Sequence, residues 1–459
     1  MQSQSELPSC IDGLPPGPRW PRFAQTIVWG TMPVAFTRYC QQRYGDVFTL
    51  RTLAIGDVVA VADPGVIKDV FGADRDVLCA GQANAVMGPL VGVHSLLLLD
   101  GERHLSQRRM MLPPFHGEAI GRYEQLVEEI TMAEIARWPR GEPFAMRPRM
   151  QAITLEVILR AVIGVRDPQR LRELRRALPR LLSVSLPTMW AVWARPQLAA
   201  NRLARLTALR HRAHVDRLLN EEIAAHRDDP AGREDILALL IASLDEDGRP
   251  LSDVELRDQM ITLLLAGHET TATVLAWCFE RLTRHEACME RLQSELSENG
   301  DGPYLQAVIS ETLRVRPVLD AVWRKLAGSA TIAGYTLPAG VTVMPSIALV
   351  HHGKHFQASE EFRPERMLTG APAPYTLIPF GGGPRRCIGA AFAMMEIKTV
   401  LRLVLEYLDV RADREQAERI RVRNVTLVPA RGARALVTPR APETSRREGA
   451  VNTLTSGPC

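Results

Sequence analysis

Apolar residues recur at helical spacing over most of the chain, and the pattern is clearest from residue 253 to about residue 284. Ser252 and Glu255 stand at the start of this segment with the spacing of a capping box, and the residues from Met260 to Ala266 are almost all apolar. A helix that is apolar on every side is buried in its protein. The pattern therefore predicts a long central helix that forms the spine of the structure.

Other periodic segments predict further helices and a small sheet. Leu and Ala recur every three or four positions from about residue 171 to residue 226, which predicts two surface helices with an apolar link at residues 186–196. Pro303 opens another helical segment and Pro317 ends it. Runs of β-branched residues predict strands at residues 47–53, 57–62 and 330–343. We therefore expect a mainly α fold with a small β-rich lobe.

No internal repeat or low-complexity block divides the 459 residues. This predicts a single domain from residue 13 to residue 438, between loose tails at residues 1–12 and 439–459. The start of the chain lacks the basic stretch, apolar run and cleavage site of a secretory signal. Its most apolar stretch, residues 27–36, is too short to span a membrane and contains Pro33. We expect no membrane anchor and a cytoplasmic protein.

Charge and cysteine content narrow the classes of function. The formal net charge is only +4, so the composition does not point to nucleic acid as a partner. The seven cysteines are odd in number, scattered and free of CxxC pairs. This pattern argues against a disulfide framework and a structural zinc site, and it fits a reducing cytoplasm.

One cysteine stands in a setting suited to a metal ligand. The segment from Pro379 to Gly389 places three glycines and a proline in a tight loop and delivers Cys387 to the start of the helical run 390–405. Unpaired amide N–H groups and the helix dipole favour a thiolate there, and a thiolate can ligate a haem iron. A glycine turn before a buried cysteine is the simpler alternative. However, the spacing F-x-x-G-x-R-x-C-x-G, which begins at Phe380, is rarely met by chance.

This loop resembles the haem-binding loop of the cytochromes P450, and other segments resemble that family's motifs in the same order along nearly the whole chain. The segment from Glu311 to Arg314 resembles the ExxR helix, and the segment ending in Arg366 and Met367 resembles the loop whose arginine completes a buried triad. The resemblance implies that Glu311, Arg314 and Arg366 lock the structure behind the haem. Taken alone, the i, i+3 spacing of Glu311 and Arg314 also fits an exposed ion pair worth ~0.2–0.5 kcal/mol. Met367 replaces the more usual phenylalanine, and we expect no functional consequence from this apolar change.

The resemblance implies haem b as the cofactor and Cys387 as the axial ligand of its iron. Residues 100–109 resemble the helix that touches the haem propionates, with His104 where many members carry tryptophan. His104 and Arg108 are spaced i, i+4 and so can reach the same carboxylates. The predicted propionate contacts are His104, Arg108, Arg324 and Arg385, and the other predicted haem contacts are Phe380, Gly267 and Gly389.

A polar motif interrupts the apolar central helix between Ala266 and Thr271. A glycine, an acid and two hydroxyls in such a helix are costly unless they are used. The motif resembles the family's oxygen-activating segment, where the O–O bond breaks heterolytically after its distal atom is protonated. The resemblance implies that Thr270 holds the oxygen or its water and that Glu269 connects this relay to solvent as an acid or base. It also implies that Gly267 leaves room for oxygen.

The activity implied by the resemblance is that of a haem-thiolate monooxygenase. Such an enzyme inserts one oxygen atom from dioxygen into a hydrophobic organic substrate with two electrons from NAD(P)H. The chain has neither the length nor the cysteine spacing for a fused flavin or iron–sulfur domain, so we expect a separate ferredoxin and ferredoxin reductase. Arg109 and Arg386 belong either to a docking face for an acidic partner or to an ordinary solvated surface. The loop and tail patterns look most like soluble bacterial members, actinobacterial ones among them.

Substrate contacts carried over by position are mostly aliphatic, with Asp320 as the polar exception. They are Met87, Leu90, Leu263, Ala266, Leu319, Val322 and Val425. Three rival functions remain: a peroxide-driven relative, an isomerase or dehydratase on the same fold, and a non-catalytic haem sensor or carrier. Each would depart from the pair Glu269 and Thr270 or have no need of it, and this chain has the pair.

Overall fold

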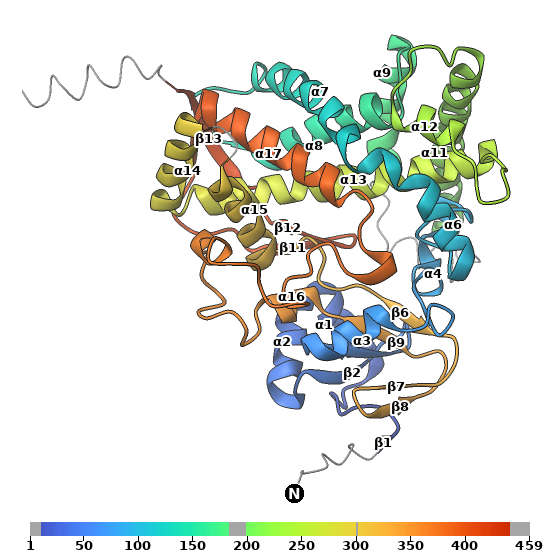
Figure 1. The fold of residues 1–459 in the computed structure, drawn as a ribbon. Helices are drawn as coiled ribbons and strands as arrows, with labels where there is room; N and C mark the ends of the chain where they lie inside the picture. The colour runs from blue at the N-terminus through green and yellow to red at the C-terminus, as the bar shows by residue number, and fades with distance from the viewer. Residues whose placement is uncertain (1–10, 183–198, 300–301, 441–459) are drawn as a thin grey trace, which may run out of the picture.

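The computed structural model describes residues 11–182, 199–299 and 302–440, and these form a helical lobe stacked on a smaller β-rich lobe (Figure 1). The β-rich lobe combines N-terminal segments with residues from the second half of the chain. This architecture confirms the predicted mainly α fold with a small β-rich lobe. The apolar link predicted at residues 186–196 lies outside the described residues.

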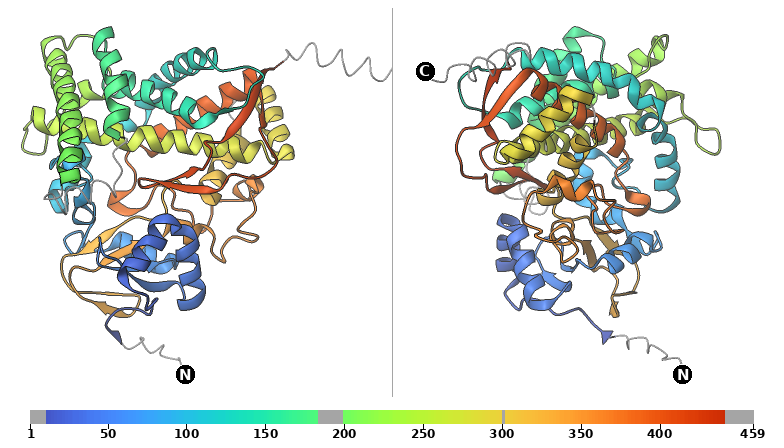
Figure 2. Two further views of the ribbon diagram at one scale, coloured as in Figure 1. Left: turned by 180° about the vertical axis from the view of Figure 1, so that it is seen from behind. Right: turned by 60° about the vertical axis from the view of Figure 1, so that its left-hand side comes forward.

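The β-rich lobe is built on a five-stranded mixed sheet in the order β2-β3-β9-β6-β4. Its strands are β2 (Val47–Arg51), β3 (Asp57–Val61), β4 (Leu78–Cys79), β6 (Arg324–Leu326) and β9 (Thr342–Pro345). β3 pairs in parallel with β9, where Val59 and Val343 are opposite each other and fully buried. The helices of this lobe are α1 (Arg22–Thr31), α2 (Pro33–Tyr44), α3 (Pro64–Gly72) and α16 (Ile347–His351), as Figure 2 shows from two further sides.

Of the three smaller sheets, two join distant parts of the chain and the third is the local hairpin of β11 and β12. Their strands are β1 (Ile11–Asp12) with β8 (Tyr335–Leu337) and β7 (Ala330–Ile332), β10 (Leu408–Ala412) with β13 (Arg434–Pro439) and β5 (Phe144–Ala145), and β11 (Ile420–Arg423) with β12 (Thr426–Pro429). The pairing of Ile11 with Tyr335 and of Pro439 with Leu408 extends regular structure beyond the predicted domain limits of residues 13 and 438. Of the loose tails predicted at residues 1–12 and 439–459, residues 1–10 and 441–459 lie outside the described residues.

The central helix α13 (Asp253–Leu282) runs through the helical lobe and confirms the predicted spine (Figure 1). Ser252 and Glu255 form the predicted capping box, in which the Ser252 amide donates to the Glu255 carboxylate at 2.9 Å. Helices that pack against α13 include α8 (Met146–Val157) with its π-helical extension η3 (Ile158–Val162), α15 (Pro303–Val315) and α17 (Ala390–Tyr407). Pro303 begins α15 as predicted.

Further helices complete the chain. They are α4 (Ala80–Ala83), α5 (Gly88–Val91), α6 (Gly101–Met111), α7 (Glu118–Ile135), α9 (Pro168–Leu182), α11 (Ala199–Asp228), α12 (Ile236–Ala242) and α14 (Glu286–Asn299). Short 3₁₀ turns are η1 (Ala85–Met87), η2 (Pro113–Phe115), η4 (Pro364–Met367) and η5 (Gly383–Arg385). α9 and α11 are the two helices predicted on either side of the apolar link.

One continuous apolar core surrounds α13, and two separate apolar clusters fill the β-rich lobe. Trp277 is fully buried, and its indole N–H donates to the carbonyl of Leu427 at 2.8 Å, which ties α13 to β12. Among the residues that the structure describes, no helix is long and apolar enough to cross a bilayer.

Candidate functional site

The loop before α17 is folded by its own backbone. The Cys387 amide donates to the Phe380 carbonyl at 2.9 Å, which closes the loop into a tight turn. Gly383 has a φ of 63°, and a side chain there would collide with the backbone of Phe71, so only glycine fits. Gly389 is the N-cap of α17. The chain therefore places Cys387 just ahead of a helix, as the glycine spacing predicts.

The thiol of Cys387 has competing influences on its pKa. The residue is exposed to solvent, yet the protein packed around it excludes much of the surrounding water. This desolvation is the largest influence and leaves the pKa of the Cys387 thiol raised, although the Gly389 amide and the cations of Arg108 and Arg386 act to lower it. An accessible sulfur with an amide and two cations beside it is placed to gain a metal ion, which favours the thiolate.

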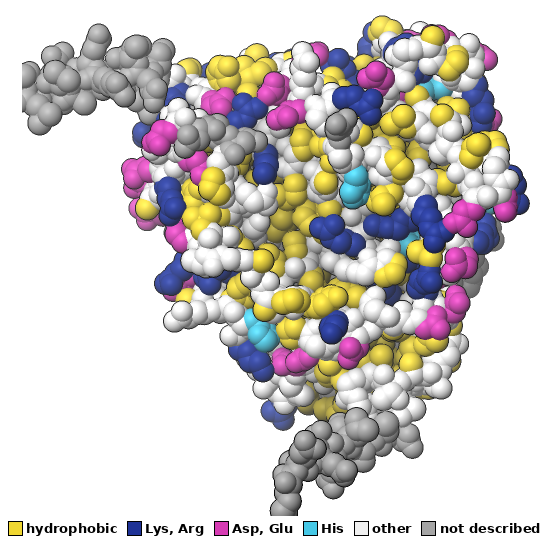
Figure 3. All heavy atoms as spheres, viewed as in Figure 1, with side chains coloured by type: hydrophobic (Ala, Val, Ile, Leu, Met, Phe, Trp, Pro, Cys, Tyr) yellow, Lys and Arg dark blue, Asp and Glu magenta, His cyan; other side chains and the backbone are white. Residues whose placement is uncertain are grey.

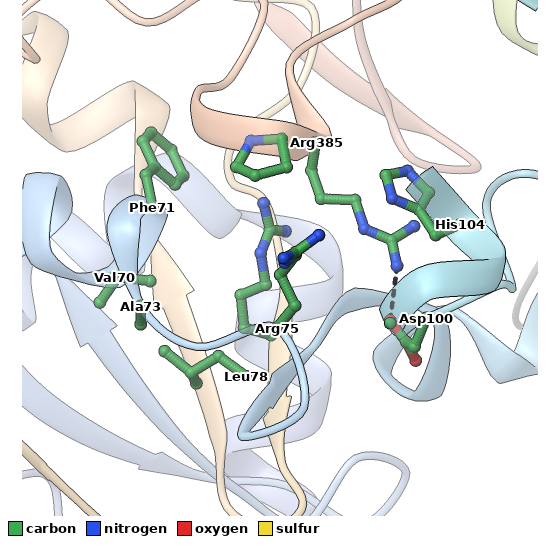
Figure 4. Close-up of a pocket in the computed structure, with 11 residues that line it drawn as sticks. Val70, Phe71, Ala73, Arg75, Leu78, Asp100, His104 and Arg385 are labelled. Atoms are coloured by element: carbon green, nitrogen blue, oxygen red, sulfur yellow. Dashed lines mark hydrogen bonds and ion pairs between the residues drawn. The ribbon is translucent and has the colours of Figure 1, made fainter. Parts of the chain in front are cut away.

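Cationic side chains gather beside this loop, around a small cavity between α3, α6, β6 and the loop itself. Figure 4 shows Arg75, His104 and Arg385 turned toward the same space, with Asp100 joined to Arg385. His104 is buried, and burial together with Arg385 and Arg108 lowers its pKa to about 3, so the ring is neutral at pH 7.

The cluster carries more positive than negative charge. Asp100 is the single acid that lines the cavity among the described residues, and its oxygens accept from Arg385 at 2.5 Å and from the Gly81 amide at 2.7 Å. Arg324 is buried, lines the same cavity, and forms no ion pair with any described residue; burial lowers its pKa to about 10. Arg108 also forms no ion pair within the described part of the chain. The predicted propionate contacts His104, Arg324 and Arg385 thus line one cavity, and Arg108 is close enough to both His104 and Cys387 to interact electrostatically with each.

Glu311, Arg314 and Arg366 form one buried ion network behind the cysteine loop. Arg314 donates to both Glu311 oxygens, at 2.7 and 2.8 Å, and Arg366 donates to Glu311 at 3.0 Å. The side chains of Glu311 and Arg314 are both 0% exposed, which excludes the exposed pair that their spacing alone allowed. Met367 packs against the main apolar core, so the side chain at that position fills space.

His351 connects this network to the cysteine loop, a role that no local pattern in the sequence indicates. The His351 carbonyl accepts from Arg314 at 2.9 Å, and its ring Nε2 accepts from the Ile378 amide at 2.8 Å. Burial, His352 and Arg314 lower the pKa of His351 to about 3, which keeps the ring neutral and able to accept. Arg314 and His351 therefore hold the backbone two residues before Phe380.

The polar motif of α13, from Ala266 to Thr271, has one face open to solvent and another packed against α8. Ala266 is exposed although it lies in the middle of a buried helix, and Thr270 lies one turn later on the same face. The Thr270 hydroxyl donates to the Ala266 carbonyl at 2.5 Å. Its oxygen therefore keeps lone pairs that can accept a further hydrogen bond.

Glu269 points instead toward α8. Its carboxylate pairs with Arg147 and accepts from the Gln151 amide at 2.8 Å, and Arg423 lies 3.9 Å away. No hydrogen bond joins Glu269 to Thr270 in the described structure. The sequence analysis did not single out Arg147 and Gln151. Their i, i+4 spacing places both on one face of α8, which is a signal for a shared partner.

The residues beside Glu269 also bond to α8. Thr154 donates to the His268 carbonyl at 3.0 Å, and the His268 ring lies 3.0 Å from the same hydroxyl. Burial lowers the pKa of His268 to about 4. A Cβ added at Gly267 would meet the Ile158 side chain at 3.0 Å, so this glycine admits the first residue of η3. That packing differs from the role predicted for Gly267, whose contact with oxygen stays a prediction.

The predicted substrate contacts divide between the two lobes. Leu319 and Val322 pack with the β-rich core, whereas Met87, Leu90 and Leu263 belong to the core around α13. Val425 is exposed at the turn between β11 and β12. The predicted arrangement of all seven around one substrate cavity stays a prediction.

Asp320 is directed away from the aliphatic set. Its carboxylate accepts from the Trp29 side chain on α1 and from the amides of Asp320 and Ala321. Burial raises its pKa to about 6. The Asp320 carboxylate thus takes part in the packing of the β-rich lobe. Its place as the polar exception among the substrate contacts stays a prediction.

Comparison with known proteins assigns the chain to a family. A family model described as Cytochrome P450 matches residues 14–436. The chain is 46% identical over 434 residues to the putative cytochrome P450 135B1 of Mycobacterium tuberculosis, covering 93% of this chain and 91% of the relative. It is 39% identical over 402 residues to the putative cytochrome P450 137 of the same organism, covering 87% and 84%.

Solved structures share the fold. A retinoic acid bound cyanobacterial CYP120A1 superposes with a TM-score of 0.80 at 24% identity, covering 93% of this chain and all of that one. The cytochrome P450DA heme domain superposes with a TM-score of 0.82 at 23% identity, covering 95% and 99%. The family model covers most of the chain, and so do the relatives. The chain therefore belongs to the cytochrome P450 family, and it is a haem-thiolate monooxygenase that binds haem b.

Proposed function

We propose that this P450 inserts one oxygen atom from dioxygen into a hydrophobic organic substrate, with two electrons from NAD(P)H that a separate reductase and ferredoxin deliver in the cytoplasm. One observation carries the proposal: an accessible cysteine stands beside a cationic cluster whose arginines outnumber Asp100, the one carboxylate that lines the cavity among the described residues. A dianionic cofactor with a metal centre satisfies both features at once.

The chain's residues fit this cofactor by their chemistry. Cys387 supplies the thiolate ligand, and His104, Arg108, Arg324 and Arg385 hold the two propionates. His104 is neutral and so donates a hydrogen bond without adding charge. When bound, the haem supplies the iron at which dioxygen is activated. Phe380, Gly389 and Gly267 are assigned as its further contacts.

Thr270 and Glu269 are assigned to proton delivery. The Thr270 oxygen is free to accept from, or share a proton with, a water on the open face of α13. Arg147 and Gln151 hold the Glu269 carboxylate on the α8 side, so protons pass from Glu269 to Thr270 through solvent. We expect Thr270→Val to keep NAD(P)H consumption but divert dioxygen to hydrogen peroxide, whereas Thr270→Ser keeps product formation.

Electrons are proposed to arrive at the face that carries the cysteine loop. Figure 3 shows Lys and Arg side chains near the middle of one face, over α6 and the loop before α17. Arg103 and Arg386 are exposed there, while Arg109 pairs with Glu246. An acidic ferredoxin matches this charge and would approach the shortest route to Cys387.

The substrate is proposed to be apolar. The assigned contacts Met87, Leu90, Leu263, Ala266, Leu319, Val322 and Val425 offer only aliphatic surface. With the Asp320 carboxylate bonded to Trp29, none of the assigned positions supplies a charge to the substrate. A fatty acid, terpenoid or steroid skeleton fits such a lining.

The decisive test is the absorption spectrum of the dithionite-reduced protein under carbon monoxide. A thiolate ligand gives a strongly red-shifted Soret band, and we expect Cys387→Ala to abolish it while Cys288→Ala, a matched change at a half-buried cysteine, leaves it intact. Folded protein without that band would overturn the assignment of Cys387. A sensor or carrier would show the band but consume no dioxygen with any substrate and competent electron donors.

The two remaining rivals are separated by their co-reactants. A peroxide-driven relative would turn over with hydrogen peroxide and gain nothing from NAD(P)H and redox proteins. An isomerase or dehydratase would convert substrate without incorporating labelled oxygen from dioxygen. We expect dependence on NAD(P)H and incorporation of one labelled atom.

A further inference from the structure

One face of α8 contacts the polar motif of α13 at four successive positions. These positions are spaced i, i+4, i+7 and i+11, which places them on one line along the helix, and they are Arg147, Gln151, Thr154 and Ile158. The first two bond to the Glu269 carboxylate, the third bonds to His268, and the fourth lies against Gly267. Contacts with α8 therefore set the position and rotation of α13 at this turn.

Thr154 makes two hydrogen bonds to one residue of the motif. Its hydroxyl donates to the His268 carbonyl at 3.0 Å, and Nδ1 of the His268 ring lies 3.0 Å from the same hydroxyl oxygen. A hydroxyl has one proton to donate. Because that proton goes to the carbonyl, Nδ1 must donate the ring proton to the hydroxyl. Thr154 is 0% exposed and His268 5% exposed, so both bonds are shielded from solvent.

The ring of His268 is neutral and carries a single proton. Burial is the largest influence on it and lowers its pKa to about 4, although the Glu269 carboxylate acts to raise it. The contact with Thr154 places the one ring proton on Nδ1. The ring proton of His268 is therefore used to hold α13 against α8.

The next contact along α8 is also fixed closely. The π-helical turn η3 begins at Ile158, whose carbonyl accepts from the Ile163 amide at 3.0 Å. A Cβ added at Gly267 would meet the Ile158 side chain at 3.0 Å, so the two helices approach closely at this level. Closely packed helices resist small shifts, and π-helical turns are frequent at functional sites.

We propose that Thr154 and His268 form a positioning pair, which sets the direction in which α13 presents the Thr270 hydroxyl to the oxygen site. The inference rests on the proposed role of Thr270 in proton delivery. Thr270 follows His268 by two residues on one continuous helix, so a shift or rotation at His268 moves the Thr270 hydroxyl by a comparable amount. A misplacement of about 1 Å at a reacting group can cost about a hundredfold in rate.

The test observes the oxygen site through the C–O stretching band of the dithionite-reduced holoenzyme under carbon monoxide. Carbon monoxide binds iron in place of dioxygen, and its stretching frequency responds to the polar groups beside it. Thr154→Val removes the hydroxyl and keeps the shape of the side chain. We expect it to shift or split the band, because α13 loses both bonds at His268. Thr154→Ser keeps the hydroxyl and should restore the wild-type band.

Thr131→Val on α7 is the matched control. Thr131 is also 0% exposed, and its hydroxyl donates at 2.6 Å to the Val127 carbonyl of its own helix. The control loses a buried hydroxyl that bonds within α7, so it should keep the wild-type band even where its free energy of unfolding falls as much as that of Thr154→Val. An equal change of the band in the two variants would overturn the positioning role.

Thr270→Val separates this inference from the proposed function. We expect this variant to move the C–O band, because it removes the hydroxyl that faces the oxygen site. An unmoved band in Thr270→Val would overturn the assignment of Thr270 and the inference with it. A moved band in Thr270→Val beside an unmoved band in Thr154→Val would overturn the inference alone.

The ring proton of His268 gives a measurement that does not depend on the folding of any Thr154 variant. Nuclear magnetic resonance of isotope-labelled histidine in the diamagnetic carbon monoxide complex reports which ring nitrogen carries the proton, and His268→Asn identifies the signal. We expect the proton on Nδ1. A proton on Nε2 would overturn the pair, because Nδ1 would then have nothing to donate to Thr154.

Discussion

Two buried histidines of this P450 lie in opposite electrostatic surroundings. His226 on α11 is 2% exposed and lies between Glu222 and Asp235, with its Nε2 2.9 Å from the Asp235 carboxylate. Burial alone would lower its pKa, but hydrogen bonds to the two acids raise it to about 9. His104 on α6 is also 2% exposed, but burial and the neighbouring arginines lower its pKa to about 3.

The difference separates a cluster whose buried charges are paired within the chain from one that has an excess of positive charge. Around His226, Arg170 donates to Glu222 at 2.6 Å and Arg233 lies 3.5 Å from the same carboxylate, so each cation is paired with an acid of the chain. We call this group the balanced cluster. Around His104, the arginines outnumber the one carboxylate of the cavity. A balanced buried cluster holds helices together, whereas an unbalanced one has room for a ligand of the missing charge.

The largest effect is expected from breaking the balanced cluster with Glu222→Gln. The change leaves Arg170, His226 and Arg233 with one buried carboxylate fewer, and the free energy of unfolding should fall by about 3–5 kcal/mol. Urea unfolding at pH 7 measures it. Glu129→Gln is the matched control, because Glu129 is 64% exposed and its pair with Arg160 should contribute less than about 1 kcal/mol. Equal losses in the two variants would contradict the distinction.

The next effect is an alkaline loss of stability. The folded pKa of His226 is about 9, above the value of about 6.5 expected when unfolded. Protonated His226 therefore stabilises the fold fully below pH 6.5, and this contribution disappears as the pH rises through 9. Up to about 3 kcal/mol should be lost over this range. Urea unfolding between pH 6 and pH 9.5 checks it, and His226→Gln should flatten the dependence.

A smaller effect is expected from removing one cation of the cluster around His104. Arg324→Met should weaken haem retention by about tenfold to a hundredfold, since it removes a charge-assisted contact to a propionate. Stability of the haem-free protein should not fall, because the removed charge lacks an ionic partner among the described residues. Transfer of haem to apomyoglobin measures the first quantity. Lys325→Met, the next residue on β6, should leave haem retention unchanged because its side chain points to the other face of the strand.

The smallest effect is the opposite pH dependence of His104. Its folded pKa is about 3, below the unfolded value of about 6.5. Below pH 6.5 the unfolded chain binds a proton on His104 and the folded protein does not. The free energy of unfolding therefore falls as the pH falls below 6.5. The loss attributable to His104 should be about 1 kcal/mol between pH 6.5 and pH 5.5. His104→Asn should remove it, and an unchanged acid limb in that variant would argue against a neutral, buried ring.

Local sequence patterns predicted much of the fold and the residues at the centre of the site. The capping box at Ser252 and Glu255, the prolines that bound α15 and the glycine loop before Cys387 are short-range signals, and the structure has each of them. The chain order of motifs then identified the family. The spacing of Glu311 and Arg314 alone did not reveal their burial, because two residues on one helix face can lie inside or outside a protein.

Contacts between segments far apart in the chain were not predicted from the sequence. The bond from Ile378 to His351 joins residues 27 positions apart, and the contact of Gln151 with Glu269 spans 118 positions. Nothing local distinguishes His351 from the histidines beside it. The packing of Ile158 on Gly267 depends on the π-helical turn at the end of α8, and a sequence pattern with an α-helical period does not reveal such a turn.

The pairing of β3 with β9 means that β3 must wait for its partner strand while the chain is being synthesised. Val61 and its partner Pro345 are separated by 284 residues, and at about 5–20 residues per second a ribosome needs roughly 15–60 s to cover that distance. During this time the edge of β3 that later pairs with β9 is an unpaired strand edge, a known hazard for aggregation. The β-rich lobe must therefore be completed late, after most of the helical lobe has emerged, and cellular chaperones are expected to bind the nascent N-terminal hairpin of β2 and β3.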